Sequence, residues 1–90
     1  MNEKLIEKKL REGVSKKGGL ALKLASPFFT GLPDRLVLIP GGTARFAEIK
    51  TTGEDLSERQ KVVKAQLEKL GFQVDVLDDQ NTLDKFLKSL

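Results

Sequence analysis

The chain contains neither histidine nor cysteine, and these two absences remove several kinds of chemistry. A Ser-His triad, a cysteine nucleophile and a zinc site with thiolate or imidazole ligands are all excluded. No disulfide can form either, which agrees with a reducing compartment. Any bound metal ion would have to be held by oxygen atoms, which favours Mg²⁺, Mn²⁺ or Ca²⁺.

The sequence also lacks an apolar stretch of membrane-spanning length, and its first residues are charged where a signal peptide needs an apolar run. We therefore expect a cytoplasmic protein with no membrane partner. Ninety residues predict one domain, residues 1–90, with a single modest core. The chain has 16 Lys and Arg residues and 13 Asp and Glu residues, so its net charge is +3. This charge permits nucleic-acid binding but is weak evidence for it.

The most informative stretch runs from Gly31 to Lys50 and reads GLPDRLVLIPGGTARFAEIK. Its two apolar runs, joined by a Pro-Gly-Gly turn, predict a pair of strands. Alternation along the second strand places Phe46, Glu48 and Lys50 on one face. If the register brings Asp34 close to Glu48, two carboxylates and an ammonium meet at the sheet edge and form a site for a hard cation. The simpler interpretation is a surface ion pair between Glu48 and Lys50 with Asp34 as a turn residue, and the three residues alone favour it.

An amphipathic helix is predicted from Asn2 to about Lys17 by apolar residues that recur every four positions, Ile6, Leu10 and Val14. Steps of about 100° place Glu3 inside the apolar stripe and Glu7 at its edge. An acid on a buried stripe indicates a functional carboxylate, whereas acids in the first turns also suit the helix dipole. Spacing alone favours the dipole interpretation.

A short strand follows at Leu20–Leu24, with Lys23 on the face opposite the leucines. Lys23 is either a solvated edge residue or a phosphate contact. The loop Ala25–Pro33 then carries Phe28 and Phe29, which form a small satellite cluster, stack on a base or seal a dimer. Because this loop leads directly into Asp34, it would control access to the carboxylates.

A second helix is predicted from Leu56-Ser57 to about Leu70, with Ser57 as its N-cap. Its inward face carries Gln60, Val63, Leu67 and Leu70. Two interpretations of Gln60 are equally supported by the pattern. Its side chain either completes a capping box with Ser57 or points toward Lys50 or a phosphate.

The last elements are a strand at Phe72–Leu77, a turn at Asp78–Asn81 and a helix at Thr82–Leu90. The strand follows a helix, so we expect it to lie parallel to an earlier strand through a right-handed crossover. The inward residues of the last helix are Leu83, Phe86, Leu87 and Leu90. The order α-β-β-β-α-β-α predicts an α/β fold, bordering on α+β, with a mixed sheet flanked by helices.

Several short patterns occur here in a fixed order: G-L-P-D-R, a P-G-G turn, F-x-E-x-K on a strand and L-x-x-x-Q at a helix start. Together they resemble the PD-(D/E)XK nuclease superfamily. Within it the chain is most similar to the stand-alone virus-type replication-repair nucleases (VRR-NUC), which are often found in phages. The resemblance covers nearly the whole chain, because its length and order of elements also match. With these patterns in place, a metal-dependent nuclease becomes the favoured interpretation over a surface ion pair.

The resemblance implies that Asp34 and Glu48 bind the metal ion together with the backbone carbonyl of Ile49. The implied metal is Mg²⁺, with Mn²⁺ able to substitute. Lys50 would orient or activate the attacking water and stabilise charge on the phosphate.

Two further residues receive roles from the resemblance. Gln60 would be the helix glutamine that supports Lys50 and the water. Glu3 matches the glutamate of the family's first helix best, and Glu7 is the alternative.

The implied activity is that of a metal-dependent endodeoxyribonuclease that hydrolyses phosphodiester bonds in replication or repair. We expect a homodimer that cuts four-way (Holliday) DNA junctions, with cleavage of flaps or other replication intermediates as the alternative. Two other classes stay open, an inactive DNA-binding module and a small interaction protein that uses its Phe pair and terminal helix. The candidate phosphate contacts are Lys8, Lys9, Lys16, Lys17, Lys23 and Arg35.

Overall fold

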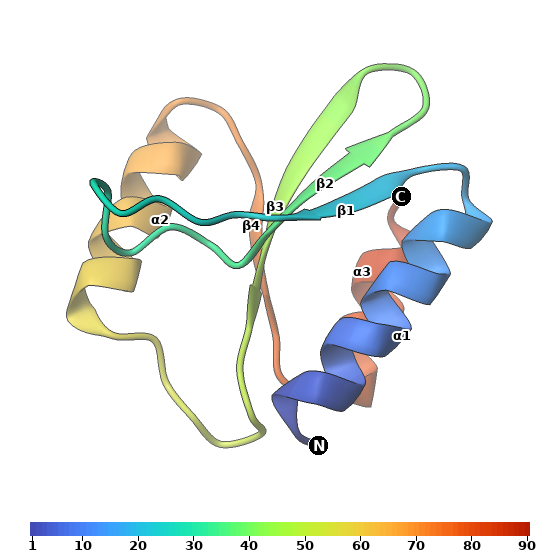
Figure 1. Cartoon of the computed structure of the whole chain (residues 1–90), viewed down its shortest axis with the longest axis horizontal. Coiled ribbons are helices and arrows are strands. Elements are labelled where there is room, and N and C mark those ends of the chain that lie inside the picture. The colour runs from blue at the N-terminus through green and yellow to red at the C-terminus, as the bar shows by residue number, and fades with distance from the viewer.

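The computed structural model describes residues 1–90 and places three helices around one four-stranded sheet (Figure 1). The helices are α1 (Glu3–Lys16), α2 (Glu58–Lys69) and α3 (Gln80–Lys88), and the strands are β1 (Leu20–Lys23), β2 (Arg35–Ile39), β3 (Thr43–Ile49) and β4 (Val74–Leu77). The sheet order is β1-β2-β3-β4; the first two pairings are antiparallel and β4 is parallel to β3. The predicted order of elements, mixed sheet and parallel last strand are therefore confirmed. None of the helices combines the length and apolar character needed to span a membrane.

Helices α1 and α3 lie side by side on one face of the sheet (Figure 1). The apolar residues that recur every four positions along α1 are fully buried, because this spacing keeps them on one side of the helix. They join apolar side chains from the sheet and α3 in one core cluster, Ile6, Leu10, Val14, Val37, Ala47, Ile49, Leu77, Leu83 and Phe86. This face of the sheet is the closed side of the molecule.

Helix α2 lies on the other face and packs against β4 (Figure 1). Its buried residue is Val63, and Val74 of β4 is buried on the same side of the sheet. The prediction that Leu70 faces inward is wrong, since its side chain is 73% exposed. The helix ends at Lys69, and the chain then turns away through Gly71, which has a positive φ of 97°.

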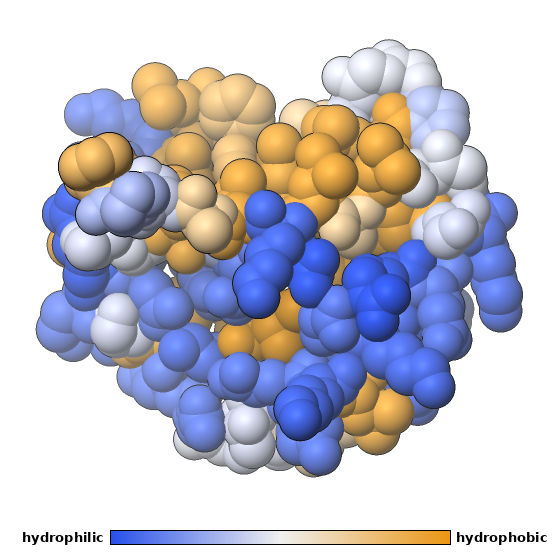
Figure 2. All heavy atoms as spheres, in the orientation of Figure 1, coloured by the Kyte–Doolittle hydropathy of each residue, from blue (hydrophilic) through white to orange (hydrophobic).

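Because α2 reaches only the β4 side, the first three strands keep an uncovered apolar surface. Its side chains alternate with the core residues along each strand and meet in cross-strand rows. We call this surface the open sheet face, and it consists of Leu20, Leu22, Leu36, Leu38, Phe46 and Phe72. Figure 2 shows hydrophobic atoms gathered above β1 on this side. Phe72 joins it through an edge-to-face contact with Phe46, with ring centres 5.6 Å apart.

Helix α3 begins at Gln80, two residues before the predicted start at Thr82. The reason is a capping box in which Asp79 is the N-cap. The Asp79 carboxylate accepts from the Thr82 N–H at 2.7 Å, and the Thr82 hydroxyl accepts from the Asp79 N–H at 3.2 Å. Residues 80 and 81 are thus part of the first turn rather than of the preceding loop.

Candidate active site

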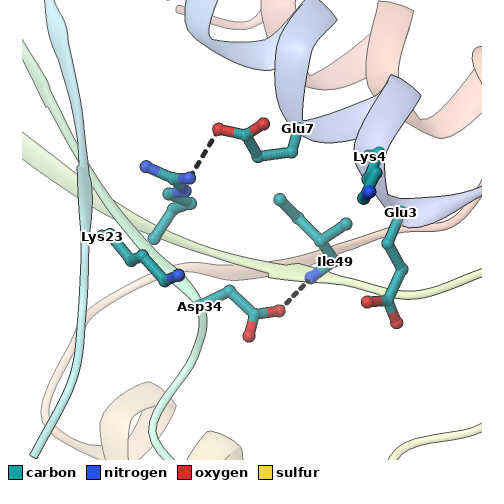
Figure 3. Close-up of a pocket in the computed structure, with 7 residues that line it drawn as sticks. Glu3, Lys4, Glu7, Lys23, Asp34 and Ile49 are labelled. Carbon is teal, nitrogen blue, oxygen red and sulfur yellow. Dashed lines mark hydrogen bonds and ion pairs between the residues drawn. The ribbon is translucent and has the colours of Figure 1, made fainter.

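The candidate site lies where the ladder between β2 and β3 stops. Arg35 pairs with Ala47, so continuing the register by two residues places Pro33 opposite Ile49. Proline has no N–H, so it cannot donate to the Ile49 carbonyl. The Ile49 N–H donates to the carboxylate of Asp34 at 2.7 Å rather than to the backbone carbonyl opposite it (Figure 3). One end of the sheet therefore holds a fixed carboxylate beside a carbonyl that lacks its ladder donor.

Glu48 precedes this carbonyl on β3 and is buried, with 1% of its side chain exposed. The pKa of its carboxyl is raised from 4.5 to about 8, and burial is the largest single cause. A hydrogen bond shared with Asp34 and the charge of Asp34 contribute to this rise, whereas the charge of Lys50 opposes it. Asp34 thus approaches Glu48, as the site hypothesis requires, and a buried Glu48 does not fit the simpler surface ion pair.

Lys50 is the first residue after β3 and is half-buried. Its N–H donates to the Leu77 carbonyl at 3.1 Å, which fixes its backbone to β4. None of the ion pairs of the chain involves its ammonium. The ammonium therefore stays near enough to Glu48 to lower its pKa while its three N–H donors remain free for a phosphate or a water.

Gln60 fulfils one of its two predicted roles and part of the other. Its side-chain oxygen accepts from the Ser57 N–H at 2.9 Å, and its own N–H donates to the Ser57 hydroxyl at 3.1 Å, so the predicted capping box is confirmed. Its amide nitrogen is then left to donate to Glu48 Oε1 at 3.2 Å. The amide points into the site toward Glu48, and its hydrogen bond goes to Glu48 rather than to Lys50.

Glu3 is exposed, so its predicted place on the buried stripe is wrong. It is the first residue of α1, and Ile6, almost one turn later, takes the buried position. Glu3 instead lines an open cavity of about 360 Å³ with Asp34 and Ile49, and its charge helps to raise the pKa of Glu48. In Figure 3 the carboxyl groups of Glu3 and Asp34 lie on the same side of Ile49.

Glu7 also lines this cavity, but its carboxylate is already occupied. It accepts from Arg35 at 2.6 Å and from Arg11 at 2.5 Å. Of the two helix glutamates considered from the sequence, Glu3 is thus the one without an ionic partner.

Some of the candidate phosphate contacts are already occupied by partners within the chain, and others are free. Arg35 is only 12% exposed and donates to Glu7 and to the Ala21 carbonyl, so it is not available to a phosphate, contrary to the prediction. Lys9 donates to Gln80 at 2.7 Å. Lys23 is exposed and reaches from β1 toward Asp34 along the cavity wall (Figure 3).

One further cation was missed from the sequence. Lys4 lines the cavity beside Glu3. Nothing in the sequence separates it from the other lysines of the first helix, because its place depends on how the helix sits over the sheet. It adds a second exposed ammonium to the cavity that Lys23 also lines.

The oxygen atoms gathered here suit a hard cation. No three acidic side chains lie close enough to hold a metal ion alone. The donors that do converge are the carboxyl groups of Asp34 and Glu48, with the Ile49 carbonyl beside them. Two carboxyl groups and a backbone carbonyl, completed by water or phosphate oxygens, are a donor set that fits Mg²⁺ or Mn²⁺.

A mixed sheet that carries a buried carboxyl group, a second carboxyl group beside it and a free lysine at one end is the arrangement expected of a nuclease-type domain. No family model matches the chain. The relative named "Putative nuclease p44", from Acyrthosiphon pisum secondary endosymbiont phage 1, is 46% identical over 81 residues, 90% of this chain and 87% of that protein. A solved structure described as a VRR_NUC domain superposes with a TM-score of 0.89 at 29% identity, over 96% of this chain and 94% of the other. The chain belongs to the VRR-NUC nuclease family.

Proposed function

We propose that the protein is a Mg²⁺-dependent DNA endonuclease that hydrolyses phosphodiester bonds, with Mn²⁺ able to replace Mg²⁺. The observation that carries the proposal is the shared hydrogen bond between Asp34 and buried Glu48, beside the free ammonium of Lys50. A buried carboxylate next to a second carboxylate is unfavourable unless a proton or a cation neutralises the pair. Family membership supports the same activity.

Asp34, Glu48 and the Ile49 carbonyl would hold the metal ion. When bound, the metal supplies a Lewis acid and lowers the pKa of its water. Lys50 neutralises negative charge that develops on the phosphate and orients the water through its free N–H donors. Gln60 keeps Glu48 in place by its 3.2 Å hydrogen bond. Glu3 lines the cavity, where its carboxylate would accept hydrogen bonds from water.

The raised pKa of Glu48 links metal binding to proton release. Near neutral pH its carboxyl is mainly protonated in the metal-free protein, because the pKa is about 8. Metal ligation needs the carboxylate, so binding displaces this proton. Loading of the site should therefore become easier as the pH rises toward 8.

The substrate we propose is a four-way DNA junction, cut by a homodimer with one site per strand. The open sheet face supports the dimer. Leu20 is 59% exposed and Leu22 is 43% exposed, and the face carries no charged side chain that would suit DNA. A two-fold dimer covers such a face with its own copy, since both partners present the same residues. Glu48 follows Phe46 by two residues on this side of β3, so the two sites would lie near the interface.

The test is incubation of the protein with a labelled four-way junction, a flap and a matched linear duplex, in Mg²⁺, Mn²⁺, Ca²⁺ or EDTA. We expect paired nicks on the junction that disappear in EDTA and in the variants Asp34→Ala and Lys50→Ala. Preferential cleavage of the flap would show that the substrate is the flap, the alternative, rather than the four-way junction. Binding without cleavage in every metal would refute the nuclease proposal and favour an inactive DNA-binding module.

A further inference from the structure

An ion pair between Glu7 and Arg35 joins α1 to the sheet next to the candidate site. Arg35 donates to Glu7 Oε1 at 2.6 Å, the contact drawn as a dashed line from Glu7 in Figure 3. Its other terminal nitrogen donates to the Ala21 carbonyl at 3.2 Å. The Arg35 and Glu7 side chains are 12% and 28% exposed. One guanidinium therefore ties together α1, β1 and β2.

The two ends of this contact adjoin residues of the site. Arg35 directly follows Asp34, whose carbonyl accepts from the Leu24 N–H at 2.9 Å. Glu7 lies about one helical turn after Glu3, on the same wall of the cavity. The pair thus connects the strand end that carries Asp34 with the helical turn that carries Glu3.

The energetics of such a pair favour a geometric role over a purely stabilising one. Partly buried ion pairs gain little net stability, because desolvation offsets the attraction between the charges. Apolar packing of Ile6, Leu10 and Val14 already holds α1 on the sheet. That packing is not directional, whereas a charged hydrogen bond fixes the rotation and position of the first turns.

We propose that the Glu7–Arg35 pair is a positioning element of the active site, which holds Glu3 and Asp34 in their mutual arrangement. The inference rests on the proposed function. The proposal also gives a role to Glu7 and Arg35, which the sequence suggested as a site glutamate and a phosphate contact and which bind each other instead. Neither touches the reacting phosphate, and each acts through its neighbour in the site.

The chain provides a matched control. Arg11 binds the same Glu7 oxygen at 2.5 Å, but it lies on α1 itself, is 53% exposed and makes no hydrogen bond to the sheet. Arg11→Gln removes an ion pair from Glu7 while leaving the link to β2 intact. Glu7→Gln and Arg35→Gln break the link, and Arg35→Lys keeps the charge with a shorter reach.

The first measurement is the ¹H–¹⁵N resonance of the Ile49 amide in metal-free protein, because this N–H donates to Asp34. We expect its shift to change and its hydrogen exchange to accelerate at least tenfold in Glu7→Gln and Arg35→Gln, with no change in Arg11→Gln. An unchanged Ile49 amide in both variants overturns the inference. This measurement needs neither metal nor DNA, so it is decisive even if the wild-type protein fails to cut.

The second measurement is steady-state cleavage of the junction. We expect kcat to fall about tenfold in Glu7→Gln and Arg35→Gln at unchanged KM, with partial recovery in Arg35→Lys. The double variant Glu7→Gln/Arg35→Gln should be no worse than either single variant. Equal losses in Arg11→Gln, or a loss that matches a smaller folded fraction seen by circular dichroism, would show that the pair has no positioning role.

Discussion

The variant Glu48→Gln should remove activity and at the same time stabilise the metal-free protein. Glutamine has the shape of a protonated glutamic acid, and its oxygen can accept the hydrogen bond from Gln60 that Glu48 accepts now. Its amide nitrogen can donate to Asp34 in place of the shared proton. It never ionises, so the buried charge and its repulsion from Asp34 are lost together with the carboxylate that metal binding requires.

The magnitude follows from the pKa of about 8 in the folded protein against 4.5 for an ordinary glutamate. Between these two values the folded protein binds this proton more tightly than the unfolded chain, so stability falls as the pH rises. The loss is about 1.4 kcal/mol per pH unit, which gives about 3 kcal/mol at pH 7 and about 5 kcal/mol above pH 8. For a domain of this size, about 3 kcal/mol corresponds to a Tm difference of roughly 10–20 °C.

The assay is thermal unfolding followed by circular dichroism between pH 5 and pH 8.5 without divalent ions. The Tm of wild type should fall below that of Glu48→Gln progressively across this range. Backbone hydrogen bonds lower the pKa of Asp55 and Asp79, so these acids titrate below the range. Glu54→Gln, the same substitution on an exposed acid, is the matched control and should follow wild type. A Tm difference between wild type and Glu48→Gln that is the same at pH 5 and pH 8 would refute the assigned burial and pKa.

Three further outcomes are expected. Lys50→Ala should reduce cleavage about 100-fold or more with little change in Tm, because the Lys50 ammonium stabilises charge in the transition state and makes no ion pair in the fold. A drop in Tm large enough to account for the lost activity would contradict this. Gln60→Ala should lower the free energy of unfolding by about 1–2 kcal/mol and also lower kcat, whereas Ser57→Ala should lose only the helix cap. Equal kcat values in the two variants, measured on folded protein, would show that Gln60 is not part of the site. Leu22→Asp on the open sheet face should give a monomer by light scattering that makes unpaired nicks, and a persistent dimer would place the interface elsewhere.

The order of elements could be predicted because each one carries a local signal. The four-residue spacing of Ile6, Leu10 and Val14 predicts a buried helix face, and Ser57 with Gln60 marks a helix start. These signals depend on residues close together in the chain. They hold whatever the rest of the molecule does, which is why the structure retains them.

The errors at Glu3 and Arg35 have the opposite property, since each depends on a distant contact. Angular position put Glu3 on the buried stripe, but the first turn of α1 lies beside an open cavity where no element covers it. Arg35, predicted as a phosphate contact, is paired instead with Glu7, which lies 28 residues away in the chain. The error at Leu70 is local, because this residue follows the helical period but lies past the last helical residue. The sequence alone does not show which parts of a helix are covered by other elements of the fold.

The two parts of the motif, P-D on one strand and E-I-K on the next, form one structural unit. Pro33 ends the ladder opposite Ile49 because it has no N–H to offer, so the Ile49 carbonyl is left without that donor. Asp34 then accepts the Ile49 N–H, which holds its carboxylate at the same strand end. Alternation along β3 sends Glu48 to the opposite side from Ile49, where Gln60 and Asp34 both reach its carboxyl. The spacing of the motif is therefore required by sheet geometry. If either half of the motif were shifted by one residue along its strand, Pro33 would no longer lie opposite Ile49 and the two carboxyl groups would point to different faces of the sheet.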